Sequence, residues 1–261
     1  MRNRKIFLVI AALLVLAAGA WTVNFVLGEP ETASAPIRSV PLELEPTAAA
    51  VLPTEMALPG STAVPTQQSA PPLAEPTETP ATRPVIFEIR QDETEVRFTL
   101  NEVLRGEPKT VVGTSNQVAG QMAVDLADLS TAQIGLIQVN ARTLATDNNF
   151  RNRAIRNVIL ETDDFEFITF APTAISGLPD TAVPGAPLTF QIAGDLTIRD
   201  VTQAVTFDVT AAAVSETRLA GTAVATVQRA DYNLVIPEVE GVADVDEAVR
   251  LEIDFVATAV P

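Results

Sequence analysis

The sequence predicts an all-β domain over residues 85–261, with about eight or nine antiparallel strands and one inserted helix. Three features lead to this prediction: short segments in which apolar and polar residues alternate, turn residues between them, and a single stretch with helical spacing. Strands that alternate throughout bury one face and leave the other in water. A closed barrel or a sandwich buries that face without an exposed edge, so the pattern alone leaves both architectures open.

The strands follow one another along the whole domain. Four segments alternate most clearly, each with three apolar residues in five: 96–100, 188–192, 205–209 and 251–255. Further strands are expected at about residues 85–90, 110–125, 132–144, 166–175 and 219–229. The turns expected between strands are rich in Gly, Pro and Asp and lie at 106–108, 177–180, 184–187 and 199–200.

One segment, at about 147–162, departs from the period of two. Phe150, Ala154 and Val158 recur at the i, i+4 spacing of a helix. The side chain of Asp147 or Asn148 would cap its first turn. The domain is therefore expected to carry one helix inserted midway between its strands.

Residues 1–28 are predicted to be a transmembrane signal-anchor. Three cations among the first five residues precede an uncharged run, 6–27, which as a helix would span about 33 Å. Because the cations lie only on the N-terminal side, the N-terminus is placed in the cytoplasm and the domain outside, as in a single-pass protein of the cell membrane. The alternative is a signal peptide cleaved after Ala20, which would give a secreted protein.

Residues 29–84 are predicted to form a disordered stalk rich in Pro, Thr and Ala. Twelve of these 56 residues are proline, and the segment has no hydrophobic periodicity of a helix or a strand. The stalk is expected to be a tether that holds the domain away from the membrane.

Composition argues against several classes of function. The chain has no cysteine and no histidine, which removes Cys nucleophiles, Cys/His metal sites and Ser-His-Asp triads. The domain holds 12 Arg and Lys against 26 Asp and Glu, so its charge of −14 disfavours nucleic-acid binding. We expect no enzymatic activity, no cofactor and no metal. Its acidic clusters, at 163–164 and 244–247, lack an EF-hand spacing and are interpreted as solvated loops.

Three motifs in the domain resemble the YceI-like family. The first is the run FRNRAIR at 150–156, followed by LET at 160–162 and FITF at 167–170. The second is the hairpin GDLTIRDVTQAVTF at 194–207, and the third is ATVQRADY at 225–232 with the closing strand 249–256. Their order and spacing cover nearly all of 85–261.

The sequence also departs from that family at a few positions. Asp200 and Asn233 stand where the family usually has glycine, and both residue types tolerate a left-handed backbone. Asn101 and Glu102 stand where many members have a histidine, so any role of that side chain is lost here.

The resemblance implies an up-and-down, lipocalin-like closed barrel of about eight strands. It also implies that a polyisoprenoid or similar quinone-like chain is bound inside the barrel. The expected protein is a membrane-tethered, extracytoplasmic binder of a long apolar lipid, with its oligomeric state, a homodimer included, left open. The competing hypothesis is a structural or protein-interaction β-domain at the cell surface with a filled core.

The expected ligand-binding residues are the apolar positions on the inner face of the strands. They are Val96, Phe98, Leu100, Ile137, Val139, Ile168, Phe170, Phe190, Ile192, Val205, Phe207, Val209, Leu251, Ile253 and Phe255. Three arginines of the predicted helix could hold a lipid headgroup: Arg151, Arg153 and Arg156. The alternative is that these arginines form a solvated face that pairs with Asp163, Asp164 and Glu166.

Overall fold

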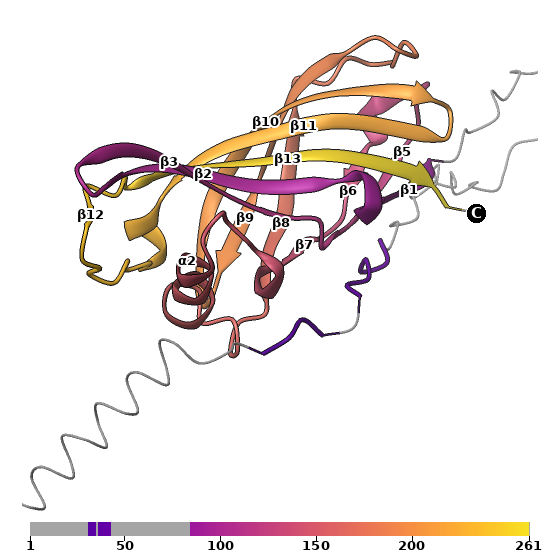
Figure 1. The fold of residues 1–261 in the computed structure, drawn as a ribbon. Coiled ribbons are helices and arrows are strands. Elements are labelled where there is room, and N and C mark those ends of the chain that lie inside the picture. The colour runs from indigo at the N-terminus through magenta and orange to yellow at the C-terminus, as the bar shows by residue number, and fades with distance from the viewer. Residues whose placement is uncertain (1–30, 35, 43–83, 261) are drawn as a thin grey trace, which may run out of the picture.

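The computed structural model describes residues 31–34, 36–42 and 84–260, and the domain within them is a curled antiparallel sheet (Figure 1). This confirms the predicted all-β class. The strands are β1 (Val85–Ile89), β2 (Glu95–Leu104), β3 (Glu107–Ser115), β4 (Val118–Ala119), β5 (Gln121–Val124), β6 (Gln133–Ile134), β7 (Ile137–Asn140), β8 (Phe167–Ser176), β9 (Leu188–Ile198), β10 (Val201–Ser215), β11 (Arg218–Gln228), β12 (Val242–Ala243) and β13 (Ala248–Ala259).

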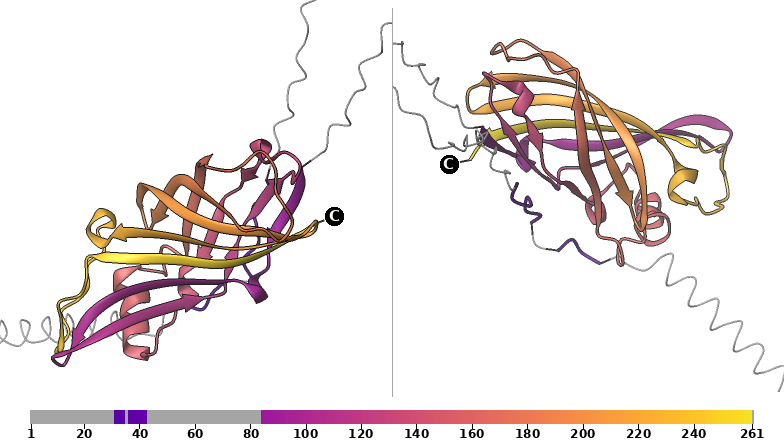
Figure 2. Two further views of the ribbon diagram at one scale, coloured as in Figure 1. Left: turned by 90° about the horizontal axis from the view of Figure 1, so that it is seen from above. Right: turned by 180° about the vertical axis from the view of Figure 1, so that it is seen from behind.

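From β7 to β11 each strand pairs with the next strand in the sequence, and β13 pairs with β11. β13 then pairs with β2 through its first half and with β1 through its last residues. β2 pairs with β3, and β1 pairs with β5. β4 pairs with β7 and β5 with β6, so the short strands connect β1 to the strands that start at β7. Figure 2 shows the curled sheet from two further sides.

Two of the predicted strands are interrupted. The stretch predicted at 110–125 forms β3, β4 and β5, and the stretch at 132–144 forms β6, β7 and a 3-10 turn, Ala141–Thr143. Gly120 stands between β4 and β5, and a Cβ atom there would lie 2.3 Å from the Ile137 side chain. Gly135 follows β6 and is less crowded, since its Cβ would lie 3.2 Å from the Gln121 backbone oxygen. Glycine allows this close approach but weakens the strand in which it stands.

The inserted helix is shorter than predicted. α2 spans Asn149–Ala154 and continues as a π-helical turn over Ile155–Ile159, so the start agrees with the predicted cap and the end falls short of the predicted range of about 147–162. Asn148, one of the two predicted caps, accepts hydrogen bonds from the backbone N–H groups of Phe150 and Arg151 at 2.8 and 3.1 Å. The chain leaves the helical conformation at Glu161, where φ is +47°.

The β9–β10 hairpin turns differently from the prediction. The left-handed residue is Arg199, with φ of +58°, and not Asp200. Arg199 is held there because its guanidinium pairs with Glu161 at 3.1 Å and lies over the ring of Phe165. Asn233, in contrast, has the predicted left-handed backbone, with φ of +54°.

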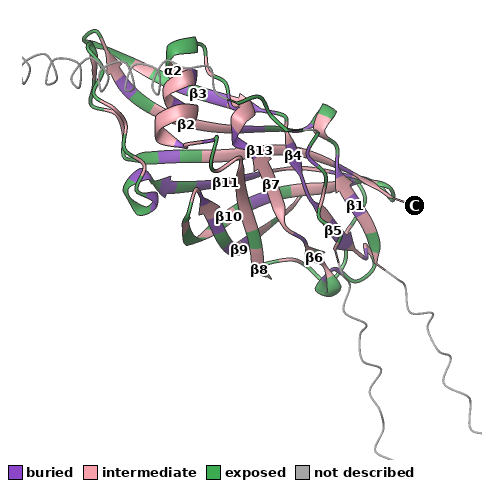
Figure 3. Ribbon diagram, turned by 90° about the horizontal axis from the view of Figure 1, so that it is seen from below, coloured by how far each residue is buried: buried purple, intermediate pink, exposed green. Residues whose placement is uncertain are grey.

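Buried residues are spread over the strands of the sheet (Figure 3), and most of them are apolar. One cluster gathers at the α2 end around Leu144, Ile155 and Tyr232, and a second gathers at the β1–β5 end around Phe87 and Val118. Phe170, Phe190 and Phe207 pack against a third cluster between them. The apolar interior therefore runs along the whole length of the sheet.

Residues 31–34 and 36–42, called the strap below, lie against this domain (Figure 1, indigo). Ser34 donates from its backbone and its hydroxyl to Glu166, at 2.8 and 2.7 Å. Ile37 is only 7% exposed and its carbonyl accepts from the Gln91 amide at 2.7 Å. The prediction of a stalk standing away from the domain is therefore wrong for these residues, while 43–83 lie outside the described part of the chain.

No helix among the described residues is long and apolar enough to cross a bilayer. The predicted anchor, 1–28, lies outside those residues.

Tyr232 makes the packing at the α2 end sensitive to alkaline pH. It is the only tyrosine of the chain, it is 1% exposed, and its hydroxyl has no hydrogen-bond partner among the described residues. Burial, together with the nearby charge of Asp231, raises the pKa of Tyr232 to about 12. Below pH 10 the phenol is protonated in both the folded and the unfolded chain, so its contribution to stability is complete there.

As the pH rises from 10 to 12, the unfolded chain loses this proton first, and the domain should lose about 2–3 kcal/mol of stability. Absorbance at the phenolate band reports this single residue and should rise only near pH 12 in the folded protein. Tyr232→Phe should remove the alkaline loss at little cost near neutral pH, because the hydroxyl that it deletes is unpaired. A phenolate that appears near pH 10 before unfolding would contradict the buried position.

A candidate cavity for an apolar ligand

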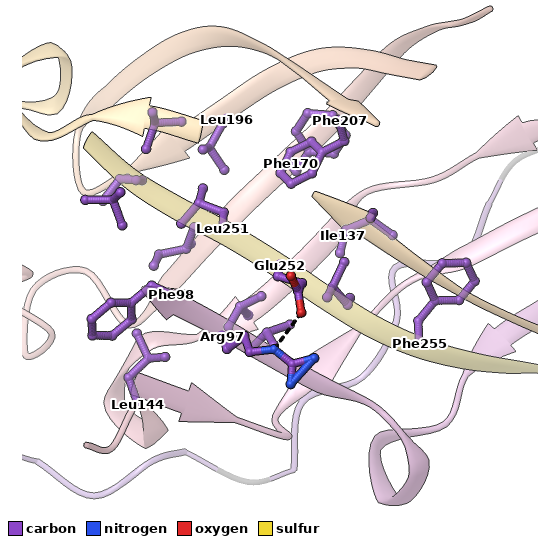
Figure 4. Close-up of a pocket in the computed structure, with 18 of the residues that line it drawn as sticks. Arg97, Phe98, Ile137, Leu144, Phe170, Leu196, Phe207, Leu251, Glu252 and Phe255 are labelled. Atoms are coloured by element: carbon purple, nitrogen blue, oxygen red, sulfur yellow. Dashed lines mark hydrogen bonds and ion pairs between the residues drawn. The ribbon is translucent and has the colours of Figure 1, made fainter. Parts of the chain in front are cut away.

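The curled sheet encloses a cavity of about 640 Å³, within the range of sites that hold small organic ligands. Its wall is built almost entirely from aliphatic and aromatic side chains of the inner strand face (Figure 4). Leu251 and Phe255 on β13 point inward with Phe98 on β2, as the period of two requires. Two charged residues of the same strands, Arg97 of β2 and Glu252 of β13, also line the cavity and pair with each other (Figure 4).

Fourteen of the fifteen residues predicted to contact a ligand line this cavity. They are Val96, Phe98, Leu100, Ile137, Val139, Ile168, Phe170, Phe190, Ile192, Phe207, Val209, Leu251, Ile253 and Phe255. Val205 shares the face of Phe207 on β10 and packs against the cluster around Leu196 and Tyr232, but it does not line the cavity. Its predicted place on the cavity wall is therefore wrong. The contacts of the other fourteen with a ligand stay a prediction.

The sequence pattern missed the two ends of the cavity. At one end the wall includes Leu126, Leu129 and Leu178 from the connections between strands. At the other end, beside α2, it includes Leu234 and Ile236 from the segment before β12. These residues lie outside alternating strands, and the only signal in the sequence is an apolar side chain in a connecting segment.

Small residues keep the interior open. Ala211, Ala213 and Ala223 line the cavity where β10 and β11 pair. Gly194 has no room for a side chain, because a Cβ atom would lie 2.6 Å from the ring of Phe170 and 2.5 Å from the Ala171 carbonyl. The ring thus lies over the glycine and meets Phe207 edge to face, with centroids 4.9 Å apart. Larger side chains at the alanine positions would occupy the volume that the cavity now leaves free.

A buried ion pair stands on the wall at the α2 end. Glu102 is 6% exposed, and its carboxylate lies 2.5 Å from the guanidinium of Arg151. Arg151 also pairs with Asp147 at 2.7 Å, and Lys109 donates to the same Asp147 at 2.7 Å. The hydrogen bond from Lys109 holds the pKa of Asp147 below its usual range. The charge of Arg151 is therefore matched by two carboxylates on the protein itself.

The three predicted headgroup arginines do not act as one group. Arg151 lines the cavity, whereas Arg153 and Arg156 line a separate surface groove of about 420 Å³ with Arg142 and residues 31–33 of the strap. Glu166, an acidic partner in the alternative hypothesis, pairs instead with Arg142 at 3.3 Å. The arginines are separated because Arg151 and Arg153 project from different sides of α2.

A second set of ion pairs joins β2 to β13. Arg97 on β2 contacts Glu252 at 2.8 Å and also pairs with Asp254, both on β13. Hydrogen bonds from Arg250, and then from Arg97, keep the pKa of Glu252 below its usual range. These charges join β2 to β13, and Arg97 and Glu252 are charged residues within the otherwise largely apolar lining of the cavity.

The predicted solvated acidic loops have protein partners in part. The Asp246 carboxylate accepts from the Asn101 side chain at 2.9 Å, and Glu247 pairs with Arg229 at 2.7 Å. The part of the chain that is described contains no group of three or more acidic residues placed to hold a metal ion.

An antiparallel sheet curled around an elongated apolar cavity defines the class of lipocalin-like β proteins. The chain belongs to the YceI-like family: the model of the YceI-like domain matches residues 87–257. This confirms the resemblance seen in the three sequence motifs.

Two solved structures share the fold at low sequence identity. BcnA of Burkholderia cenocepacia is 18% identical, with a TM-score of 0.51, and the match covers 65% of this chain and 99% of that one. A polyisoprenoid binding domain from Saccharophagus degradans, implicated in plant cell wall breakdown, is 13% identical, with a TM-score of 0.53, and the match covers 67% and 99%. No curated protein sequence is significantly similar to the chain.

Proposed function

We propose that this protein is a membrane-tethered, extracytoplasmic carrier that binds a long apolar lipid, a polyisoprenoid or quinone-like chain, inside its curled sheet. The observation that carries the proposal is the cavity of about 640 Å³ with an aliphatic and aromatic wall. An isoprenoid chain needs only such a wall, because burying its CH₂ and CH₃ groups gains about 25 cal/mol per Å². The binding of a polyisoprenoid by the structurally similar domain from Saccharophagus degradans supports the same choice of ligand.

The sheet is inferred to close into a barrel of eight strands. Pairing of β5 with both β1 and β6, and of β4 with β7, supports this closure. The count of eight takes β1–β2, β3–β5 and β6–β7 each as one interrupted strand beside β8, β9, β10, β11 and β13. A closed barrel has no free edge along which the domain could aggregate, and it surrounds the ligand on all sides.

The tether is inferred from the sequence. The run of uncharged residues at 6–27 and the cations before it support a single-pass anchor with the domain outside the cytoplasm. The alternative, a surface interaction module, would need a filled core. The cavity favours the carrier over that module.

Native mass spectrometry with lipid extraction tests the carrier function. The protein would be residues 29–261 purified from a bacterial host, so that the strap is kept. We expect a co-purifying apolar species at one-to-one stoichiometry, whose mass identifies the chain. An apo mass alone, with no binding of added isoprenoid alcohols or quinones, would leave the interaction module as the better account.

A further inference from the structure

The strap fixes which end of the cavity lies nearest to the N-terminal segment. The backbone of Glu31 donates to Asp163 at 3.0 Å, and its carboxylate pairs with Arg142 at 2.9 Å. Thr32 accepts from Arg142 at 3.2 Å, and the groove that holds these residues is shared with α2. The strap therefore enters the domain beside the α2 end of the cavity.

Glu31 lies four positions after Leu27, the last residue of the uncharged run. At no more than about 3.6 Å per residue, a fully extended chain of that length spans about 14 Å. If 6–27 crosses the bilayer, the α2 end of the domain cannot move farther than this from the membrane surface while the strap is docked.

The segment after the strap cannot act as the spacer that its composition suggests. Leu42 donates to the Gln121 side chain of β5 at 3.0 Å, and Val85 pairs with Val124 at the other end of the same short strand. The Pro-rich segment 43–83 thus starts and ends beside one strand of the domain. Its length adds nothing to the distance between the bilayer and the cavity.

The α2 end also presents the apolar side chains that suit a membrane surface. Phe150 and Val235 are each 72% exposed, and Val239 is 51% exposed. Phe150 and Val239 line the mouth of the cavity, and Figure 1 places α2 and the segment leading to β12 at the same end. Exposed aromatic and aliphatic side chains beside arginines, here Arg153, are typical of surfaces that enter the headgroup layer.

The opposite end of the cavity is built differently. Two connections cross it, and backbone hydrogen bonds tie them together: Leu129 donates to Asp180 at 2.8 Å and Ala182 donates to Leu126 at 3.0 Å. Lipid exchange through that end would require these bonds to open.

We propose that the docked strap seats the α2 mouth of the cavity on the phospholipid surface of the membrane in which the chain is anchored, so that the apolar ligand passes directly between bilayer and cavity. This inference rests on the proposed membrane-tethered carrier. Phe150, Val235 and Val239 form the contact with the lipid, and Arg153 and Arg156 meet the phosphate groups.

The test uses the full chain in phosphatidylcholine vesicles. Because the sequence has no cysteine, single cysteines can be introduced and labelled cleanly. Phe150→Cys places a fluorophore at the α2 mouth, and Val183→Cys places the same fluorophore at an exposed position of the opposite end. Quenching by a lipid with a nitroxide on its headgroup works only at short range. We expect several-fold stronger quenching at position 150 than at position 183.

Two strap variants form a matched pair for the same measurement. Ile37→Asp places a charge at a buried residue of the strap and should release the strap from the domain. The domain could then move away from the bilayer. The quenching at position 150 should fall toward that at position 183. Val40→Asp adds the same charge at an exposed residue of the strap and should leave quenching unchanged. Circular dichroism of each variant checks that the β-domain remains folded.

The outcomes separate this inference from the proposed function. If the protein does not float with the vesicles, the tether fails and the inference fails with it. If it floats but the two labels are quenched equally, or Ile37→Asp changes nothing, the seating of the α2 mouth is overturned while the tether stands. Lipid binding by residues 29–261, measured separately, decides the carrier function in either case.

Discussion

Phe207→Asp is expected to lower the affinity for an apolar lipid by roughly 100-fold or more. Phe207 lines the cavity and packs edge to face on Phe170, so the change removes one of the larger apolar surfaces from the wall. Burying a phenyl group is worth about 1.5–3 kcal/mol, and a carboxylate in an apolar site costs several kcal/mol more. A loss above about 2.7 kcal/mol corresponds to that factor. Displacement of a fluorescent isoprenoid analogue would measure it.

The neighbouring residue provides a matched control. Thr206 is exposed on the outer face of β10, so Thr206→Asp adds the same charge one position away and should leave binding unchanged. Equal losses for the two variants would mean that the charge acts through the stability of the strand and not through the cavity.

A second variant keeps the result interpretable if the buried carboxylate weakens the fold. Ala223→Phe on β11 fills part of the cavity without adding charge. Filling a void commonly stabilises a domain by about 0.5–2 kcal/mol, so the melting temperature should hold or rise while lipid binding is lost. If both variants still co-purify with one lipid per chain, the ligand does not occupy the cavity.

The alternation of apolar and polar residues was sufficient to predict the fold class and most of the residues that line the cavity. Alternate side chains of a strand point to the same face. Once Phe98 or Leu251 is assigned to the inner face, the faces of the other residues of its strand follow. The same rule is not sufficient at Val205, which packs in the cluster that contains Tyr232 of the 3-10 turn Arg229–Tyr232 and does not line the cavity. Alternation predicts the face of the sheet on which a side chain lies, but not which other side chains pack against it there.

The features that the sequence did not reveal depend on contacts between distant residues. Ser34 of the strap binds Glu166, 132 positions away, and the surrounding composition predicts an unstructured segment. The division of the arginines between two sites depends on how α2 is rotated against the sheet. Helical spacing defines which residues share a face of α2 but gives no information on that rotation.

Arg151→Met is expected to destabilise the domain by about 3–5 kcal/mol. The change leaves Glu102 buried without the guanidinium that compensates its charge, and breaking a buried pair in this way has a cost of that order. For a domain of this size, even the smaller value would lower the melting temperature by roughly 6–12 °C. Thermal unfolding followed by circular dichroism would measure the shift.

Arg153→Met is the matched control, because Arg153 lies two residues away on the same helix and makes no ion pair among the described residues. Its effect should stay within about 0.5 kcal/mol. The double variant Glu102→Leu with Arg151→Met should regain most of the lost stability, since replacing both partners of a buried pair by apolar residues is often neutral. If Arg151→Met lowers the stability no more than Arg153→Met does, water reaches Glu102. The α2 mouth of the cavity is then more open to solvent than the burial of Glu102 indicates.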